Sequence, residues 1–230
     1  MAEIIKKNEN TWMIVDGGVY FFVLEGENKA AVIDTGMTIP NAKELAESVT
    51  SKPLILLNTH CDRDHIAGND AFPEVWMHAS ELAYYCQKDH GAQVMHALFE
   101  GDEIDLGGRV LRVVALPGHT AGSACYLDVN SRVLISGDSI QRGGRIFLFG
   151  AQRNMPAYVA GLKRLKTLSL PFDEIWPSHA ETPLPPDILD AVIGDGEAAL
   201  RGELPFEITE VHGNKVKAVQ GKTNVLLMNE

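Results

Sequence analysis

The sequence has no long apolar run and little cysteine. Nowhere in its 230 residues do 18 uncharged apolar residues follow one another, and the N-terminus, Met-Ala-Glu-Ile-Ile-Lys-Lys-Asn-Glu-Asn, lacks the apolar segment of a secretion signal. The three cysteines, Cys61, Cys86 and Cys125, are an odd number at scattered spacing, which indicates neither a disulfide framework nor a zinc ribbon. We therefore expect a cytoplasmic protein with reduced thiols and no membrane partner.

Basic charge is also scarce. The sequence has 20 Lys and Arg residues against 31 Asp and Glu residues, a formal net charge of -11 that repels phosphate backbones. The basic cluster Lys163, Arg164 and Lys166 lies on a predicted helix and is typical of a solvated face. Nucleic acid is therefore not expected as a partner, and a small-molecule substrate is. The sequence does not fix the oligomeric state and leaves a homodimer open.

The 45% hydrophobic content suits one well-packed domain, and no shift in composition marks a second one, so we expect residues 1–230 to form a single domain. β-Rich apolar segments predict strands at 11–15, 19–24, 30–33, 54–57, 75–77, 110–116, 124–128, 132–136, 174–177, 206–211, 216–219 and 225–228. Helical spacing predicts helices after Pro40, from an N-cap at Ser80 to about Lys88, at 155–168 and at 185–200, the last weakened by Gly194 and Gly196. Residues 91–101 carry too little pattern to assign, and residues 142–149 indicate either a strand or a lid.

One segment is dense in metal-binding side chains. Thr59-His60-Cys61-Asp62-Arg63-Asp64-His65 follows directly after the apolar run Leu54–Leu57 and contains two imidazoles and two carboxylates. Ionisable groups at a buried strand end cost several kcal/mol unless something neutralises them, and divalent metal ions do so. The alternative is a solvated polar loop. Helix followed by apolar strand is typical of α/β layers, in which active sites form at the carboxyl ends of strands.

Further metal-competent residues follow other predicted strands. His119 lies in the glycine-flanked loop 118–122, Asp138 follows Gly137, and His179 follows Ser178. Each has an ordinary structural explanation when taken alone, but together with the 60–65 segment they indicate one metal-binding rim of a sheet. Asp34 begins an Asp-Thr-Gly turn, which is an ordinary strand exit or, if the metal loop lies nearby, a turn that holds this loop by hydrogen bonds. Three other histidines, His78, His90 and His96, have no partner at ligand spacing, and we expect them to be surface or structural residues. His212 lies beside a predicted turn, and we expect it to face solvent.

These motifs resemble those of the metallo-β-lactamase-fold superfamily. Its pattern is H-x-H-x-D-H, then a histidine in a Gly-His-Thr-x-Gly loop, an aspartate and a final histidine, preceded by an Asp-Thr-Gly turn. The likeness extends from about Trp12 to His179. It implies an α+β fold, a four-layer αββα sandwich with a binuclear metal site at one edge of the sheets.

The resemblance also implies the ligands. It gives the first metal His60, Asp62 and His119, and the second metal Asp64, His65 and His179. It makes Asp138 a bridge between the two ions, with a bridging hydroxide as the nucleophile. In this scheme Asp64 additionally acts as a catalytic residue that steers the proton of the hydroxide. Cys61 and Arg63 receive no ligand role, and we expect Cys61 to pack against the strand.

Asp62 departs from the family pattern, which has histidine at this place. With this additional carboxylate, two divalent ions, three aspartates and the bridging hydroxide have a net charge of zero, one unit below that of the usual site. A less positive site with more oxygen ligands favours harder ions. The cofactors expected are therefore two divalent metal ions, zinc by family resemblance or iron or manganese because of Asp62. Flavodiiron proteins, which reduce dioxygen or nitric oxide, are similar in having glutamate at this place.

The leading hypothesis is a metal-dependent hydrolase of a small ester, thioester, lactone or amide. The alternatives are a diiron oxidoreductase of the flavodiiron type, served by a separate electron donor, and a non-catalytic binding protein. A glyoxalase-like thioesterase is expected to carry a helical C-terminal region, whereas this sequence predicts a β meander there. Arg142, Arg145, Phe147 and Phe149 are candidates for lining a pocket, or equally for an ordinary strand and turn.

Overall fold

The computed structural model describes residues 2–230, which form two compact units. Unit 1 contains the chain up to Val114 together with Tyr126–Ser131, and unit 2 contains Ala115–Cys125 and Arg132–Glu230. The chain passes between the units within strands β9 (Val110–Ala115) and β10 (Ala124–Asp128), and again between Ser131 and Arg132. The expectation of a single domain stays a prediction, and we describe each unit by itself.

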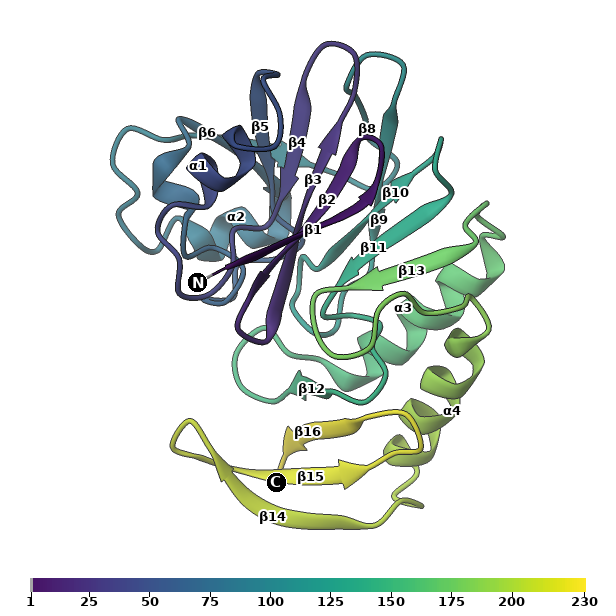
Figure 1. Ribbon diagram of the computed structural model, residues 1–230. Helices are drawn as coiled ribbons and strands as arrows, with labels where there is room; N and C mark the ends of the chain where they lie inside the picture. The colour runs from purple at the N-terminus through teal and green to yellow at the C-terminus, as the bar shows by residue number, and fades with distance from the viewer. Residues whose placement is uncertain (1) are drawn as a thin grey trace. The chain divides into compact units, whose positions relative to one another are not determined.

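Unit 1 is built on a seven-stranded sheet in the order β1-β2-β3-β4-β5-β6-β7 (Figure 1). Its strands are β1 (Glu3–Asn8), β2 (Thr11–Asp16), β3 (Val19–Glu25), β4 (Ala30–Ile33), β5 (Leu54–Leu57), β6 (Glu74–His78) and β7 (Val94–Leu98). The first four strands pair antiparallel, and β4 to β7 pair parallel. Strand β4 lies in the middle of this sheet, with β3 and β5 on its two sides, and is buried at every position.

Unit 1 also contains helices α1 (Ala42–Glu47) and α2 (Ala79–Tyr85) and the short 3-10 helix η1 (Asn69–Ala71). Ala42, Ala46 and Tyr85 join the buried side chains of β3 to β6 in one hydrophobic core. Cys61 belongs to the same core, so the expectation that it packs against the strand is confirmed. Within residues 2–230 the three cysteines form no disulfide.

The predicted N-cap of α2 is wrong. The capping residue is His78, whose Nδ1 accepts a hydrogen bond of 3.3 Å from the backbone N–H of Ser80. Burial lowers the pKa of His78, although Glu81 and Glu100 act in the opposite direction, and the neutral ring keeps a lone pair for this bond. Strand β7 fills part of the unassigned segment 91–101. Exposed residues in the strand and Gly91 before it obscure the alternation of apolar and polar residues by which a strand is recognised in a sequence.

Unit 1 also contains the hairpin of β8 (Glu103–Asp105) and β9, whose register joins Glu103 to Arg112. Arg109 follows the turn and is buried, with Nε and Nη2 bonded to Asp128 at 2.9 and 2.6 Å. Its Nη1 donates to the carbonyl oxygens of Asn10 and Glu25. A buried guanidinium satisfied in this way ties β10 to β2 and β3.

Unit 2 contains the parallel pair β11 (Val133–Gly137) and β13 (Glu174–Pro177). It also contains a four-stranded sheet in the order β12-β16-β15-β14, formed by β12 (Arg145–Leu148), β14 (Phe206–Val211), β15 (Asn214–Gln220) and β16 (Val225–Asn229). The predicted C-terminal meander is confirmed. The open question about 142–149 is answered by β12, a strand that runs parallel to β16.

Helices α3 (Met155–Thr167) and α4 (Ile188–Leu200) pack against each other in unit 2 (Figure 1). The glycines of α4 do not interrupt it. A Cβ at Gly196 would lie 2.7 Å from Cγ2 of Val159, so the glycine permits close approach of the two helices. Close packing thereby offsets the low helix propensity of glycine.

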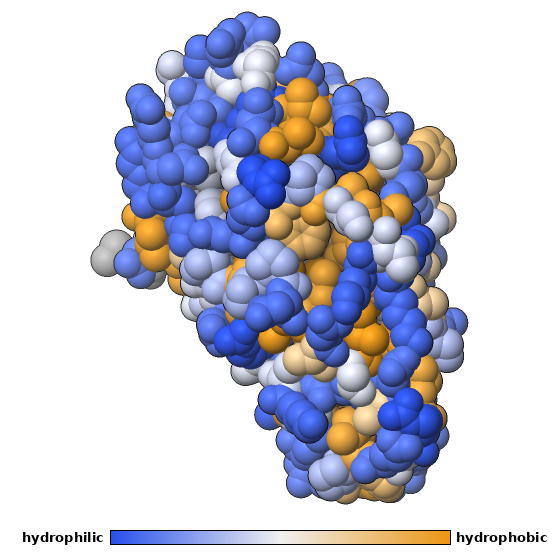
Figure 2. All heavy atoms as spheres, turned by 90° about the vertical axis from the view of Figure 1, so that its right-hand side faces the viewer, coloured by the Kyte–Doolittle hydropathy of each residue, from blue (hydrophilic) through white to orange (hydrophobic). Residues whose placement is uncertain are grey.

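Together the units form a mixed α+β fold with several sheets and few helices, as expected. No helix within residues 2–230 combines the length and apolarity needed to cross a membrane. Figure 2 shows hydrophilic residues over much of the displayed face and apolar residues gathered along its middle.

Candidate metal centre

The metal-binding motif begins at the carboxyl edge of the parallel strands of unit 1. Strands β4 and β5 pair so that Ile33 lies opposite Leu57, and both strands end there. Asp34 and Asn58 are therefore adjacent at this edge, and the N–H of Asp34 donates to the carbonyl of Leu57 at 2.9 Å. Asp34 has a φ of 66°, which is uncommon for a residue with a side chain and indicates that its contacts hold it.

The carboxylate of Asp34 organises the loop that follows β5. Oδ1 accepts the N–H of Thr59 at 2.8 Å, and Oδ2 accepts the hydroxyl of Thr59 at 2.7 Å. Oδ2 also lies 2.8 Å from Nδ1 of His65. Because an ionised carboxylate only accepts, His65 carries its proton on Nδ1. Asp34 therefore holds the motif loop by hydrogen bonds, as the Asp-Thr-Gly turn suggested.

The same carboxylate also fixes the tautomer of His60 through Thr59. The Thr59 hydroxyl gives its one proton to Asp34 and lies 3.0 Å from Nδ1 of His60, so it accepts the Nδ1 proton of that ring. Both rings are fully buried, and their centroids are 4.0 Å apart. His60 and His65 thus present the lone pair of Nε2, the arrangement found in metal-binding histidines.

Each of these Nε2 atoms has a carboxylate oxygen near it. Nε2 of His60 lies 3.5 Å from Oδ2 of Asp62, and Nε2 of His65 lies 3.7 Å from Oδ2 of Asp64. These distances are long for hydrogen bonds. They are close to the separation of about 3.4 Å between two donors that each lie about 2.1 Å from one tetrahedral ion. The spacing therefore suits ligands that share a metal better than simple ion pairs.

A buried polar network in unit 1 supports the loop and was not predicted. Asn58 donates through Nδ2 to the carbonyl of His65 at 3.1 Å, and Asn69 bonds to Asn58 and to the hydroxyl of Tyr85. Burial raises the pKa of Tyr85 to about 12, so its phenol stays protonated and donates to Gln93. Asn58 does carry a sequence signal, because it is a polar residue directly after the four apolar residues of β5.

Glu81 was also missed by sequence reasoning. It is fully buried in the first turn of α2, and its Oε2 accepts the N–H of Cys61, inside the motif, at 2.9 Å. A glutamate near a helix start is ordinary, so only the fold indicates that it holds the motif backbone.

Unit 2 brings two of its predicted ligands together at another strand edge. Strands β11 and β13 are parallel with Gly137 opposite Pro177, so Asp138 and His179 emerge at the same end. The N–H of Ser178 donates to the carbonyl of Gly137 at 3.1 Å. Nε2 of His179 lies 3.3 Å from Oδ1 of Asp138, again near the spacing of two ligands on one ion.

His119 joins Asp138 within the same unit. Its Nε2 lies 3.7 Å from Oδ2 of Asp138, and its Nδ1 lies 3.0 Å from the carbonyl oxygen of Phe147. A carbonyl only accepts, so His119 also carries its proton on Nδ1 and presents the lone pair of Nε2. Gly118 permits the close approach of this loop to α3, because a Cβ there would lie 2.3 Å from Cα of Tyr158.

The predicted ligands thus lie at strand ends in both units, four in unit 1 and three in unit 2. The histidines given structural roles have them: His78 caps α2, His90 lies 3.2 Å from Asp70, and His96 lies 3.0 Å from Glu74. His212 is exposed, as expected, and its ring also stacks on Phe147 with centroids 5.8 Å apart.

The fold and these residues define a mixed α+β protein with metal-competent side chains at its strand ends. Residues 14–179 match the family model of the metallo-beta-lactamase superfamily, so the chain belongs to that superfamily. The metallo-beta-lactamase from Pontibacter korlensis aligns in structure with a TM-score of 0.73 and 17% identity, covering 86% of this chain and 99% of that one. The chain therefore has the metallo-β-lactamase fold.

Similar sequences include one protein named as a thioesterase and one named as a hydrolase. The acyl-coenzyme A thioesterase MBLAC2 of Gallus gallus is 28% identical over 184 residues, covering 64% of this chain and 66% of that protein. The hydroxyacylglutathione hydrolase of Synechococcus sp. (strain JA-2-3B'a(2-13)) is 30% identical over 169 residues, covering 71% and 64%. The chain spans slightly less than two thirds of the length of these relatives.

Proposed function

We propose that this protein is a metal-dependent hydrolase of a small ester, thioester, lactone or amide. The observation that carries the proposal is the common orientation of His60, His65 and His119. Each ring gives its Nδ1 proton to an oxygen acceptor and presents Nε2 beside a carboxylate. Within this superfamily, such pre-oriented ligands support metal hydrolysis.

We assign the two divalent ions the ligands His60, Asp62, Asp64, His65, His119, Asp138 and His179. When bound, the ions supply an activated water as nucleophile and polarise the carbonyl of the substrate. We assign Asp64 a second role, that of holding the proton of the attacking water. The Asp64 side chain is 30% exposed, so it has access to solvent as well as to the neighbourhood of His65.

A thioester is the first substrate class to test, because the two similar proteins named above act on acyl-coenzyme A and hydroxyacylglutathione. The purified protein would be reconstituted with zinc, iron or manganese and assayed on both thioesters and on a panel of esters, lactones and β-lactams. We expect hydrolysis of at least one compound, loss of activity with a chelator and recovery with metal. Inactivity on every compound with every metal would contradict the proposal.

A matched pair of variants tests the site. We expect Asp138→Asn to lose at least a hundredfold in kcat, because the carboxylate proposed to bridge both ions is removed. Asp105→Asn, at an exposed position in β8, should behave as the wild type. Equal activity of the two variants would refute the assignment of Asp138.

Because of Asp62, oxidoreductase activity is the second candidate function. Its Oδ2 lies 3.5 Å from Nε2 of His60, so a carboxylate stands where the family pattern has an imidazole, and harder ions are favoured. Metal analysis of freshly purified protein separates the two functions. Zinc without redox-active iron would exclude the oxidoreductase.

A further inference from the structure

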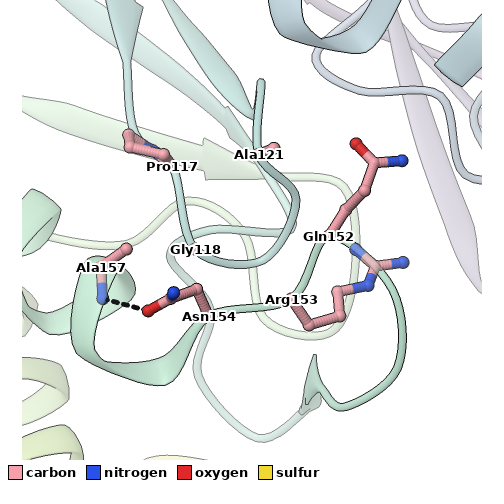
Figure 3. A pocket seen from close by; sticks show the side chains of 7 residues that line it. All are labelled: Pro117, Gly118, Ala121, Gln152, Arg153, Asn154 and Ala157. Atoms are coloured by element: carbon pink, nitrogen blue, oxygen red, sulfur yellow. Dashed lines mark hydrogen bonds between the residues drawn. The ribbon is translucent and has the colours of Figure 1, made fainter. Parts of the chain in front are cut away.

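Unit 2 contains a pocket that the proposed ligand set does not use (Figure 3). Its volume is about 380 Å³, and two segments line it, the His119 loop through Pro117, Gly118 and Ala121, and the start of α3 through Gln152, Arg153, Asn154 and Ala157. Small-molecule sites usually measure about 300–1,000 Å³, so this pocket suits one small group. Arg142, Arg145, Phe147 and Phe149, considered as pocket residues from the sequence, do not line it.

The lining combines apolar surface with hydrogen-bond donors and one positive charge. Pro117, Ala121 and Ala157 supply the apolar part, and the consecutive residues Gln152 and Arg153 (Figure 3) supply a side-chain amide and a guanidinium. No lining residue is acidic, in a chain with 31 acidic residues. A guanidinium carries five N–H donors in a planar fork that matches a carboxylate. The chemistry therefore selects an anion with a short apolar group.

Hydrogen bonds hold the two walls of the pocket together. The N–H of Asn154 donates to the carbonyl of Gly118 at 2.8 Å, and Arg153 donates through Nη1 to the carbonyl of His119. The Asn154 side chain accepts the N–H of Ala157 at 2.8 Å, which fixes the first turn of α3 (Figure 3). A pocket whose walls are tied in this way needs little ordering when a ligand binds.

We infer that this pocket binds a small organic anion, a carboxylate on a short apolar group. Arg153 and Gln152 would bind the carboxylate, and Ala121, Ala157 and Pro117 would contact the apolar group. The anion could be the non-reacting end of the substrate or a separate small acid. The assignment of the anion to the substrate rests on the proposed function, whereas the binding of an anion in this pocket does not.

Binding is tested with butyrate and its uncharged analogue butyramide on ¹⁵N-labelled, metal-loaded protein. We expect butyrate to shift the backbone amides of Gly118, Ala121 and Ala157, and butyramide to bind at least tenfold more weakly. Ala157→Phe fills the pocket and should abolish these shifts. Ala160→Phe, at an exposed position of the same helix that does not line the pocket, is the matched control and should retain them.

Two results would overturn the inference: butyrate shifts absent from these three amides, or equal butyrate affinity in the two phenylalanine variants. Arg153→Gln gives a further check, because removing the charge should make butyrate and butyramide bind equally. The amide shifts need no turnover, so a protein that binds butyrate but hydrolyses nothing would refute the proposed function and leave the pocket assignment standing.

Kinetics on a hydrolysed thioester separate the two sources of the anion. If the pocket binds the non-reacting end of the substrate, butyrate should raise KM and leave kcat unchanged in the wild type and in Ala160→Phe. Ala157→Phe should not show this rise in KM. Butyrate that changes kcat through the same pocket identifies a separate acid. Bound butyrate that alters neither parameter would overturn the assignment to the substrate.

Discussion

Asp34 is the residue on which the geometry of unit 1 depends most. It bonds directly to His65 and, through the Thr59 hydroxyl, fixes the proton of His60. In Asp34→Asn an amide N–H₂ replaces one of the acceptor oxygens, so the rings lose part of their orientation. We expect metal affinity to fall by about 10- to 100-fold, measured by competition with a chromophoric chelator. Asp70→Asn, an exposed aspartate beside His90, should leave the affinity unchanged.

Thr59 allows a sharper test at the same place. Thr59→Val keeps the shape of the side chain but removes the hydroxyl between Asp34 and His60, whereas Thr59→Ser keeps the hydroxyl. We expect the valine variant to lose at least tenfold in metal affinity and the serine variant to retain most of it. Similar affinities for the two variants would show that the hydroxyl does not orient His60.

Asp16 shows how a carboxylate shapes the loop after β4. It accepts the N–H groups of Met37 and Thr38 at 2.8 and 2.6 Å, and also the Thr38 hydroxyl. Burial opposes ionisation, but these hydrogen bonds outweigh it and lower the pKa of Asp16 below 3.8. Asp16 therefore stabilises the fold fully above pH 3.8, and this contribution is lost as the pH falls through the lower pKa of the folded state.

We expect Asp16→Asn to lower the free energy of unfolding at pH 7 by about 2 kcal/mol, measured with urea. The difference from the wild type should shrink in acid. Asp89→Asn, at an exposed position where the carboxylate accepts the N–H of Gly91, is the control. A difference that stays constant down to pH 3 would contradict the account of Asp16.

At the level of single residues, the placement of the candidate ligands at strand ends could be predicted, because imidazoles and carboxylates that follow apolar strands are visible in the sequence. The role of Glu81 could not be predicted, because its hydrogen bond to the N–H of Cys61 depends on how α2 packs. The carbonyl of Phe147 could not either, since a backbone acceptor has no sequence signature. Capping by His78 was missed because histidine caps a helix only when its ring is neutral.

At the level of elements, β12 and the C-terminal sheet support His119. The carbonyl that accepts from His119 belongs to Phe147 in β12, and β12 pairs with β16 about 80 residues further along the chain. Within residues 2–230 β12 pairs with no strand nearer along the chain, so its local pattern is weak, which explains why residues 142–149 could not be assigned from sequence. The C-terminal strands lie beyond the 14–179 family match.

Asn224 connects this sheet to the loop after Asp138. Its Nδ2 donates to the carbonyl of Gln141 at 2.7 Å and its Oδ1 accepts the N–H of Gly144 at 3.1 Å, while Gln141 donates to the carbonyl of Asp138. We expect Asn224→Ala to release bound metal at least fivefold faster and to speed exchange of the Gly144 amide hydrogen. Asn214→Ala, exposed in β15, should change neither rate. Unchanged Gly144 exchange in Asn224→Ala would refute this connection.

At the level of the whole molecule, the proposed ligands come from segments spread over some 120 residues of both units. Any ion that they share binds only the folded chain, so it stabilises the fold by mass action. Removing metal with a chelator should lower the free energy of unfolding by about 4 kcal/mol if metal had been present at 1,000 times its Kd. The Asp138→Asn variant should respond less to the chelator. A wild-type Tm unaffected by chelation would contradict metal binding at these residues.

The strands and helices along the chain were largely predictable, because alternating and continuous apolar segments mark them. The sheet of unit 1 follows the order of its strands along the chain, whereas the order β12-β16-β15-β14 in unit 2 could not be predicted in the same way, since β12 pairs with a strand about 80 residues away. The αββα layers were expected only through the family resemblance. The fold class rested on the motifs, and the match to the superfamily confirms it.

The most direct test is a crystal structure of the metal-loaded protein with anomalous scattering measured above and below the iron and zinc edges. The account predicts two ions, with His60, Asp62 and His119 on one, Asp64, His65 and His179 on the other, and Asp138 on both. A single ion bound only by residues of the 60–65 loop, or His119 and His179 without a metal, would contradict it.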